Sequence, residues 1–312
     1  MTITQLQYVL AVAEHQNFTK ASEHCFVTQP TLSMQIQKLE DQLDVQIFDR
    51  SKKPIELTEV GKKIVSQAKN IVNESERIKD IIDQEKGFIG GEFKLGVIPT
   101  IMPTLLPLFL KTFITKYPKV QLKIREHTTD EIIKLVNDGH LDAALAATPL
   151  QHENIKERVL YYEPFVGYIP EGHRLYAEKE ITPDALEIDD MLLLEDGHCF
   201  KESVLAICRA KNGSNINGFN LASGSFETLI KLSNEGMGMT LLPYLHAREL
   251  HENDKRNIKN FKDPKPAREV SLIFHKSELK MQIIEALQST ISSIIRGAIA
   301  FQDVKIISPL KK

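Results

Sequence analysis

The stretch FTKASEHCFVTQPTLSMQIQKLEDQL, residues 18–43, decides the fold of the amino-terminal part. One short helix opens at Phe18. A second begins around Pro30, because proline suits the first turn of a helix and Thr28 or Gln29 stands just before it as a cap. Apolar residues recur on one face of this second helix, at Met34, Ile36, Leu39 and Leu43. Two short helices joined by a tight turn predict a helix-turn-helix, whose second helix enters the major groove of DNA.

The outward face of that second helix carries short or flexible polar side chains. We expect the following residues to contact bases and phosphates: Thr28, Gln29, Pro30, Thr31, Ser33, Gln35 and Lys38. A basic turn between two short extended pieces follows and is typical of a wing, in which Arg50, Lys52 and Lys53 would meet phosphates or the minor groove. Residues 1–60 hold five Lys and Arg but eight Asp and Glu, so we expect DNA binding to depend on this local cluster and only modestly on salt.

One long helix is predicted from residue 59 to about 86. Its apolar positions alternate spacings of four and three, at Ile64, Ala68, Ile71, Ser75, Ile78 and Ile82. Such a heptad seam predicts that the helix pairs with its copy in a dimer. The alternative is a helix that packs on its own domain. We therefore assign residues 1–58 to the DNA-binding domain and residues 59–90 to a linker helix and hinge.

Beyond residue 90 the chain alternates candidate strands with candidate helices. Strands are predicted over residues 93–97, 120–124 and 141–146, with helices over 102–117 and 130–138 between them. Further strands are predicted near 165–169, 191–194, 239–242 and 270–274, and a closing helix over 279–301. This alternation predicts an α/β regulatory domain with a parallel sheet over residues 91–302. Thr100 and Thr129 follow the first two strands, at the edge where such sheets bind ligands, although each could simply cap a helix.

The composition is that of an ordinary globular protein of more than one domain. The 312 residues are 42% hydrophobic and 26% charged, with a formal net charge of −3. No apolar run approaches the roughly 18 residues needed to span a bilayer, and we see no signal peptide, so we expect a cytoplasmic protein without a membrane partner. Three cysteines do not make a structural disulfide framework, and any disulfide should be transient. We expect no metal and no cofactor.

Two of the three cysteines stand nine positions apart in the run DGHCFKESVLAIC, residues 196–208. A helix predicted over residues 200–207 would place the α-carbons of Cys199 and Cys208 about 13 Å apart, at about 1.5 Å of rise per residue. A disulfide needs roughly 4.4–6.8 Å. The segment must therefore unwind before the thiols pair, which makes the pair a candidate switch. Two buried structural cysteines are the alternative. Cys25, among apolar neighbours, is expected to be a small buried side chain.

Over essentially its whole length the chain resembles the LysR-type transcriptional regulators. The matching residues are 18–22, 28–33, 36–40, 43, 48–50 and 57–61. Within the family it resembles the hydrogen-peroxide sensors, on residues 194–199, the second cysteine nine positions later, and residues 96–100 and 236–243. The resemblance implies a winged helix-turn-helix domain and a regulatory domain of two Rossmann-like halves, similar to periplasmic binding proteins and joined by two crossover strands. Half I would cover about 91–162 and 268–302, and half II about 163–267.

The resemblance also implies roles. Cys199 would be the peroxidatic cysteine and Cys208 the resolving one, and their reversible disulfide would remodel residues 199–225 and activate antioxidant genes. The residues that would bind peroxide are Thr100, Thr129, His198, Asp142 and Arg268. A histidine often found before Ser225 is absent, and Asn217 or Asn220 occupies that region. The implied partners are promoter DNA, RNA polymerase, further copies of the chain in a dimer of dimers, hydrogen peroxide, and a thiol reductant such as glutaredoxin or thioredoxin.

The reactivity of Cys199 should come from placement rather than from a strongly acidic thiol. A helix amino terminus and Lys201 would favour the thiolate, but Glu195, Asp196 and Glu202 oppose it. We therefore expect donors positioned around the peroxide. Two alternatives remain for the function. The α/β cleft could bind a metabolite while the cysteines stay redox-inert, or the chain could be a thiol peroxidase with a DNA-binding head; the resemblance implies no enzyme.

Overall fold

The computed structural model describes residues 1–85, 89–195, 199–208, 223–299 and 304–307. It divides the chain into two compact units, residues 1–86 and 87–312, and each is described by itself. Within the described residues, no helix is both long enough and apolar enough to cross a membrane.

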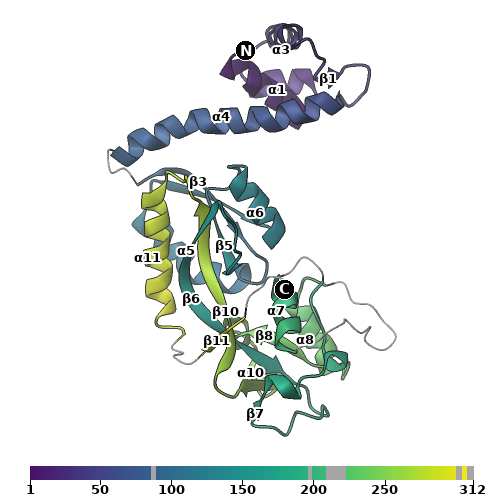
Figure 1. Ribbon diagram of the computed structural model, residues 1–312, viewed down its shortest axis with the longest axis vertical. Helices are drawn as coiled ribbons and strands as arrows, with labels where there is room; N and C mark the ends of the chain where they lie inside the picture. Colours follow the sequence, from purple (N-terminus) through teal and green to yellow (C-terminus); the bar gives the residue numbers. More distant parts are fainter. Residues whose placement is uncertain (86–88, 196–198, 209–222, 300–303, 308–312) are drawn as a thin grey trace. The chain divides into compact units, whose positions relative to one another are not determined.

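The first unit is the predicted helix-turn-helix with a wing and a long helix (Figure 1). Its elements are α1 (Ile3–His15), α2 (Phe18–His24), α3 (Gln29–Leu43), the antiparallel pair β1 (Phe48–Asp49) and β2 (Glu56–Leu57), and α4 (Glu59–Glu85). Leu32, Ile36 and Leu39 of α3 are fully buried in the core of this unit, where α3 packs against α1 and α2. Thr58 Oγ1 accepts a hydrogen bond from the Gly61 N–H at 2.9 Å, and a Cβ at Gly61 would overlap the Ile47 carbonyl oxygen. Only glycine therefore lets α4 start so close to the wing.

The two ends of α4 differ in what covers their apolar face. Val65, Ala68 and Val72 are buried in the core of the first unit, with Ile64 and Ile71 packed beside them. Ile78 and Ile82 are 61% and 47% exposed. The alternative prediction for the heptad pattern is that the helix packs on its own domain. This is correct for the first half of α4. In the single chain, the second half presents uncovered isoleucines.

The second unit is built on a mixed sheet of nine strands in the order β4-β3-β5-β10-β6-β9-β7, with β11 beside β10 and β8 beside β6. The strands are β3 (Gly91–Val97), β4 (Val120–Glu126), β5 (Ala143–Thr148), β6 (Ile155–Tyr168), β7 (Glu180–Ile181), β8 (Thr240–Pro243), β9 (Ile258–Phe261), β10 (Lys265–His275) and β11 (Val304–Ile306). The helices are α5 (Met102–Lys116), α6 (Thr129–Asn137), α7 (Cys199–Ile207), α8 (Phe226–Asn234), α9 (Tyr244–Arg248), α10 (Glu252–Lys255) and α11 (Met281–Ile295), with 3-10 turns at Pro183–Ala185 and Ile188–Asp190.

The prediction of a parallel sheet is right for one part and wrong for another. Strands β3, β4 and β5 are parallel, but β10 runs antiparallel to both β5 and β6. The predicted strand over residues 191–194 is only a single bridge, from Met191 to Met239. The first half of β6 was missed, because residues 155–163 mix charged and apolar side chains and their burial follows no clean alternation.

Two hydrophobic cores lie toward opposite ends of the long strands β6 and β10 (Figure 1). One core collects β3, β5, α5, α6 and α11, with α11 and α6 on opposite sides of the sheet (Figure 1). The other collects β8, α7, α8 and the 3-10 turns. Both cores receive residues from β6. The structure thus confirms two α/β halves joined by two crossover strands.

Candidate functional site

Cys199 is the first residue of α7 and sits where the two cores meet. Its side chain is 8% exposed and belongs to the core of β3 and β5, whereas the next side chain, Phe200, belongs to the other core. Phe200 packs against Phe165 and Phe226, with ring centroids 5.1 and 4.9 Å apart. Consecutive residues buried in different cores fix the amino terminus of α7 in both halves at once. The predicted helix and its start near Cys199 are confirmed.

Two of the predicted site residues, Thr129 and Arg268, interact with this cysteine, and a third, Thr100, is bound to Arg268. Thr100 and Thr129 follow the parallel strands β3 and β4, so both lie at the same carboxyl edge of the sheet. Arg268, on β10, donates from Nη1 to Thr100 Oγ1 at 2.8 Å and from Nη2 to the Thr100 carbonyl at 3.0 Å. Its guanidinium carbon lies 5.5 Å from the Phe200 ring centroid. Neither threonine caps a helix: the cap of α6 is Thr128, and α5 has no side-chain cap.

The electrostatics of the pocket favour a protonated thiol with donors around it. Burial raises the pKa of Cys199, and the Thr129 hydroxyl, the Arg268 guanidinium and the backbone N–H groups at the start of α7 lower it only in part. Thr129 Oγ1 is buried and has no partner in regular hydrogen-bond geometry among the described residues, so its contact with the sulfur is loose and the hydroxyl can bind a ligand. This agrees with the expectation of positioned donors rather than a strongly acidic thiol.

Cys208 lies just past the other end of α7. It is half-buried against the core of β8 and α8, and burial raises its pKa to about 11. The two thiols are separated by the whole of α7, and the described residues hold all three cysteines as free thiols. A disulfide between Cys199 and Cys208 therefore requires α7 to unwind, as the spacing indicated.

Asp142 does not belong to this cluster, and its assignment to the peroxide site is corrected. Strands β3 and β5 are parallel, and Ala143 at the start of β5 pairs with Leu95 of β3. Asp142 comes just before the amino-terminal end of β5, whereas Thr100 comes after the carboxyl end of β3, so the two residues lie toward opposite ends of the strands. The Asp142 carboxylate accepts hydrogen bonds from the Lys94 N–H at 2.6 Å and from Lys280 Nζ at 3.0 Å. Asp142 thus ties β3 to the segment that leads into α11.

His198, Asn217 and Asn220 lie outside the described residues. A pocket of about 490 Å³ lies next to the cluster and is lined by Pro99, Glu126, His127, Thr128, Glu131, Glu195, Gly224 and Ser225. Pro99 and Thr128 directly precede Thr100 and Thr129. Sequence reasoning missed His127, whose ring lies 3.5 Å from the Glu131 carboxylate. The sequence feature that could have indicated His127 is its position directly after β4, at the same carboxyl edge of the sheet for which Thr129 was predicted.

The predicted reading face of α3 is only partly outward. Thr28 caps the helix by accepting from the Thr31 N–H, and Thr28, Gln29, Pro30, Thr31 and Lys38 are exposed. Ser33 and Gln35 are half-buried, and Gln35 Oε1 accepts a hydrogen bond from Gln5. Sequence reasoning missed Phe26, which is 95% exposed and turns the chain into α3 with a φ of +54°. Cys25, expected to be buried, is half-buried at the end of α2.

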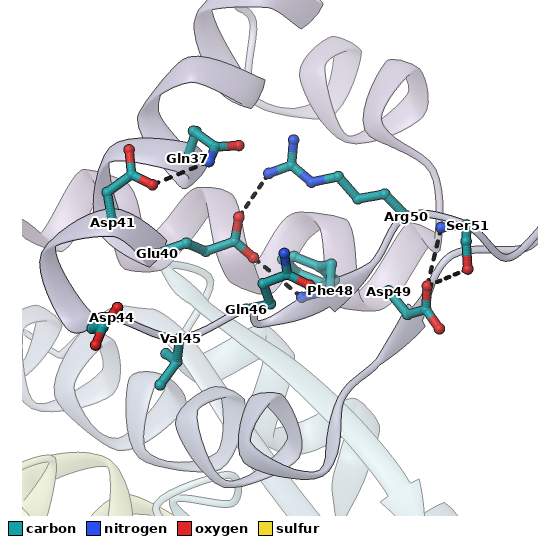
Figure 2. A pocket seen from close by; sticks show the side chains of 10 residues that line it. All are labelled: Gln37, Glu40, Asp41, Asp44, Val45, Gln46, Phe48, Asp49, Arg50 and Ser51. Carbon is teal, nitrogen blue, oxygen red and sulfur yellow. Dashed lines mark hydrogen bonds and ion pairs between the residues drawn. The ribbon is translucent and has the colours of Figure 1, made fainter.

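Two of the three basic wing residues have internal partners. Arg50 Nη2 lies 2.7 Å from Glu40 Oε2, and Figure 2 shows the Arg50 side chain reaching back from the wing to α3. Glu40 Oε1 also accepts the Ile47 and Phe48 N–H groups at 2.7 and 3.3 Å. Lys52 pairs with Glu56 at 2.5 Å, while Lys53 is exposed. Arg50 therefore holds the wing in place, whatever else it contacts.

Comparison with known proteins shows to which family a chain of this architecture belongs. The family model described as a bacterial regulatory helix-turn-helix protein of the lysR family matches residues 3–62, and the LysR substrate binding domain matches residues 86–292. The chain belongs to the LysR family. LysR-family relatives include the hydrogen peroxide-inducible genes activator of Pectobacterium carotovorum, 31% identical over 95% of this chain and 98% of that protein. The DNA-binding transcriptional dual regulator OxyR of Escherichia coli is 31% identical over 95% of this chain and 97% of its own length.

Solved structures of LysR-family proteins give the same picture. A full-length OxyR variant from Pseudomonas aeruginosa matches with a TM-score of 0.73 and 32% identity, over 94% of this chain and 98% of that one. A cysteine mutant of OxyR from Corynebacterium glutamicum, with hydrogen peroxide bound, matches with a TM-score of 0.63 and 27% identity, over 95% of this chain and 93% of that one. The similarity therefore spans both units of the chain.

Proposed function

We propose that this LysR-family protein is a DNA-binding transcriptional regulator that responds to hydrogen peroxide. A reversible disulfide between Cys199 and Cys208 switches it, and the oxidised protein activates antioxidant genes. The observation that carries the proposal is the Cys199 pocket: a buried thiol at a helix start, beside the Thr129 hydroxyl and the Arg268–Thr100 pair. Relatives named as hydrogen peroxide-inducible activators support it. The half-buried position of Cys208 at the far end of the same helix supplies the second thiol.

The chemistry follows from these positions. The Cys199 sulfur attacks one oxygen of hydrogen peroxide, an S–O bond forms and the O–O bond breaks. The proton of the thiol passes to the second oxygen, which leaves as water, and Cys199 becomes a sulfenic acid. Thr129 Oγ1, Thr100 Oγ1 and Arg268 can orient the peroxide and stabilise the charge that develops on the leaving oxygen. The Cys208 sulfur then attacks the sulfenic sulfur, forms the disulfide and releases a second water. A dithiol reductant, such as glutaredoxin or thioredoxin, would return both thiols.

The switch lies in the mismatch between α7 and the disulfide. Bond formation pulls Cys199 and Phe200 out of two different cores, so oxidation and repacking occur together. His198, beside Cys199 in the sequence, completes the proposed peroxide site. We expect the change to reorient an interface between copies of the chain and thereby to re-space the DNA-binding domains.

The test is to add one equivalent of hydrogen peroxide to the reduced protein and to map the cysteines by mass spectrometry. We expect a Cys199–Cys208 link that reverses with a dithiol. The Cys208→Ser variant should instead hold sulfenic acid at Cys199, whereas the matched Cys25→Ser variant should behave as the parent. Free thiols at both positions would point to a metabolite in the 490 Å³ pocket beside Thr100. Repeated turnover with a thiol reductant would point to a thiol peroxidase.

The proposed DNA-contacting surface is the amino-terminal turn of α3 with Phe26 before it and the wing after it. Thr28, Gln29 and Thr31 are exposed at the end of α3 that a helix-turn-helix places at base edges. The remaining proposed contacts are Pro30, Ser33, Gln35, Lys38, Arg50, Lys52 and Lys53. Gln29→Ala should weaken binding to a promoter fragment by about tenfold or more, the loss expected for one good base contact. Gln37→Ala, an exposed glutamine later on the same helix, is the matched control and should leave binding unchanged.

The partners follow from the same proposal. Exposed Ile78 and Ile82 on the second half of α4 support pairing of α4 with its copy in a dimer, and the family supports a dimer of dimers that contacts RNA polymerase at the promoter. Ile78→Glu should lower the oligomeric mass measured by light scattering, whereas the more deeply packed Ile64 serves poorly for this test because it also holds the first unit together. An unchanged mass would reject the α4 interface.

A further inference from the structure

Glu163 is a fully buried carboxylate that neither a sequence motif nor the chemistry above uses. It lies on β6 directly opposite Arg268 in the β6–β10 register. Its Oε2 accepts from Arg268 Nε at 2.9 Å and from Nη2 at 2.7 Å, and its Oε1 accepts from the Leu245 N–H of α9 at 2.9 Å. A charge this deep in the protein is retained only with a partner, and here the partner is a residue of the Cys199 pocket.

The carboxylate decides which way the Arg268 guanidinium faces. Two of the five guanidinium N–H groups are directed to Glu163 and two to Thr100, so one Nη1 hydrogen is left without a partner among the described residues. The Phe200 ring covers the guanidinium at 5.5 Å. Arg268 is thus held along two edges that share Nη2, one on Glu163 and one on Thr100, and cannot turn without breaking a charged hydrogen bond.

We propose that Glu163 is a positioning residue of the Cys199 site: it holds the Arg268 guanidinium on Thr100 and keeps it from pairing directly with the sulfur. The inference rests on the proposed function, since it assigns how that site is set. Arg268 then offers one N–H and an already matched charge. The sensor reacts through placed donors, and the thiol does not exist as a standing thiolate open to every electrophile.

Removing the charge of Glu163 should therefore release Arg268 toward Cys199. In Glu163→Gln the amide can still accept one hydrogen bond, but the buried guanidinium loses its anion. Tyr161, His246 and Cys199 are the other titratable groups that face Arg268. The Cys199 thiol is the one that can supply the anion, because histidine yields none and burial raises the pKa of Tyr161 well above its ordinary value. An opposite charge brought within about 4–6 Å lowers the pKa of an acid by about one unit or more. At neutral pH that shift means about tenfold more thiolate.

The test is the pH profile of alkylation of Cys199 by iodoacetamide, in the full-length protein with Cys25→Ser and Cys208→Ser as background. We expect Glu163→Gln to shift the midpoint about one unit down, to raise the rate at pH 7 about tenfold, and to slow the reaction with peroxide because Thr100 loses its fixed donor. Glu163→Asp keeps the charge and should keep the parent midpoint. Glu269→Gln, the adjacent residue on the opposite face of β10 with its side chain on Thr148, is the matched control and should also keep it.

A looser pocket would also lower the midpoint, by exposing the thiol, and a second background separates the two causes. With Arg268→Met, the further change Glu163→Gln should produce no shift, because the effect passes through the guanidinium. An equal shift in that background, a shift in Glu163→Asp, or no shift in Glu163→Gln would each overturn the proposal. Because alkylation needs no peroxide, a parent protein that fails to react with peroxide would count against the proposed function and leave this test standing.

Discussion

The two units each contain a glutamate–arginine pair built to the same pattern but in different surroundings. In both, the shortest N–O distance is 2.7 Å and the glutamate also accepts backbone N–H groups, two for Glu40 and one for Glu163. In both, the guanidinium lies over a phenylalanine ring, at 5.2 Å for Arg50 on Phe18 and 5.5 Å for Arg268 on Phe200. The difference is exposure. The Arg50 side chain is 38% exposed and its partner Glu40 6%, whereas Arg268 and Glu163 are 2% and 0% exposed.

Exposure decides what each pair can do. Water screens the Arg50 charge, so that pair adds little free energy and mainly holds the wing on α3. Within the part of the chain that the structure describes, Glu40 takes only one of the guanidinium nitrogens, so the others stay available for a phosphate. In the dry interior the Arg268 charge cannot be left alone, and each group of that pair constrains the other. The same two residue types therefore have different effects. At the surface the pair fixes the wing on α3, and in the interior it sets the charge and position of a guanidinium beside the Cys199 thiol.

The largest effect should come from breaking the buried pair on one side only. Arg268→Ala leaves Glu163 charged and unmatched in the core, and should lower the free energy of unfolding by about 3–5 kcal/mol. Urea unfolding followed by circular dichroism measures this. The double change Arg268→Met with Glu163→Gln removes both charges and should recover most of the loss. If the single and double variants were equally unstable, packing rather than charge would explain the effect.

Cys208 shows what burial does to the pKa of an ionisable group that lies away from Arg268. Its pKa is raised from an ordinary 9.0 to about 11 by burial. The folded pKa lies above the unfolded one, so the protonated thiol contributes stability that is complete below pH 9 and is lost as the pH rises toward 11. The free energy of unfolding of the reduced protein should fall by about 2 kcal/mol more over this range than that of Cys208→Ala. Parallel curves for the two proteins would place Cys208 in contact with water.

The comparison also separates what sequence could predict from what it could not. The helix-turn-helix followed from Pro30 and the apolar spacing of α3, and the α7 helix from residues 200–207, because these are local patterns. The Glu163–Arg268 pair joins residues 105 positions apart through the register of β6 and β10, which no local pattern fixes. Asp142 was misplaced for a related reason. The sequence put it beside a strand, but only the sheet shows that it lies at the edge away from Thr100.

The surface pair should give a smaller effect than the buried one. Arg50→Ala removes a half-exposed ion pair and should cost about 1 kcal/mol, measured by the same urea unfolding. Glu40→Ala should cost more than Arg50→Ala, because the buried Ile47 and Phe48 N–H groups then lose their acceptor as well. A loss from Arg50→Ala as large as that from Arg268→Ala would contradict the distinction between the two pairs.

Lys53 is the comparison with an exposed charge that contributes little to the stability of the fold. It is exposed on the wing and, unlike Arg50 and Lys52, has no ion-pair partner within the part of the chain that the structure describes. Lys53→Ala should leave the free energy of unfolding within about 0.5 kcal/mol of the parent. If the lysine meets a phosphate, the slope of log affinity for promoter DNA against log salt should fall by about 0.9, uniformly across DNA sequences. Lys52→Ala is the matched control. The Lys52 ammonium is already paired with Glu56, so Lys52→Ala should change the salt slope less than Lys53→Ala does. Equal changes in the two variants would mean that the Lys52–Glu56 pair opens when DNA binds.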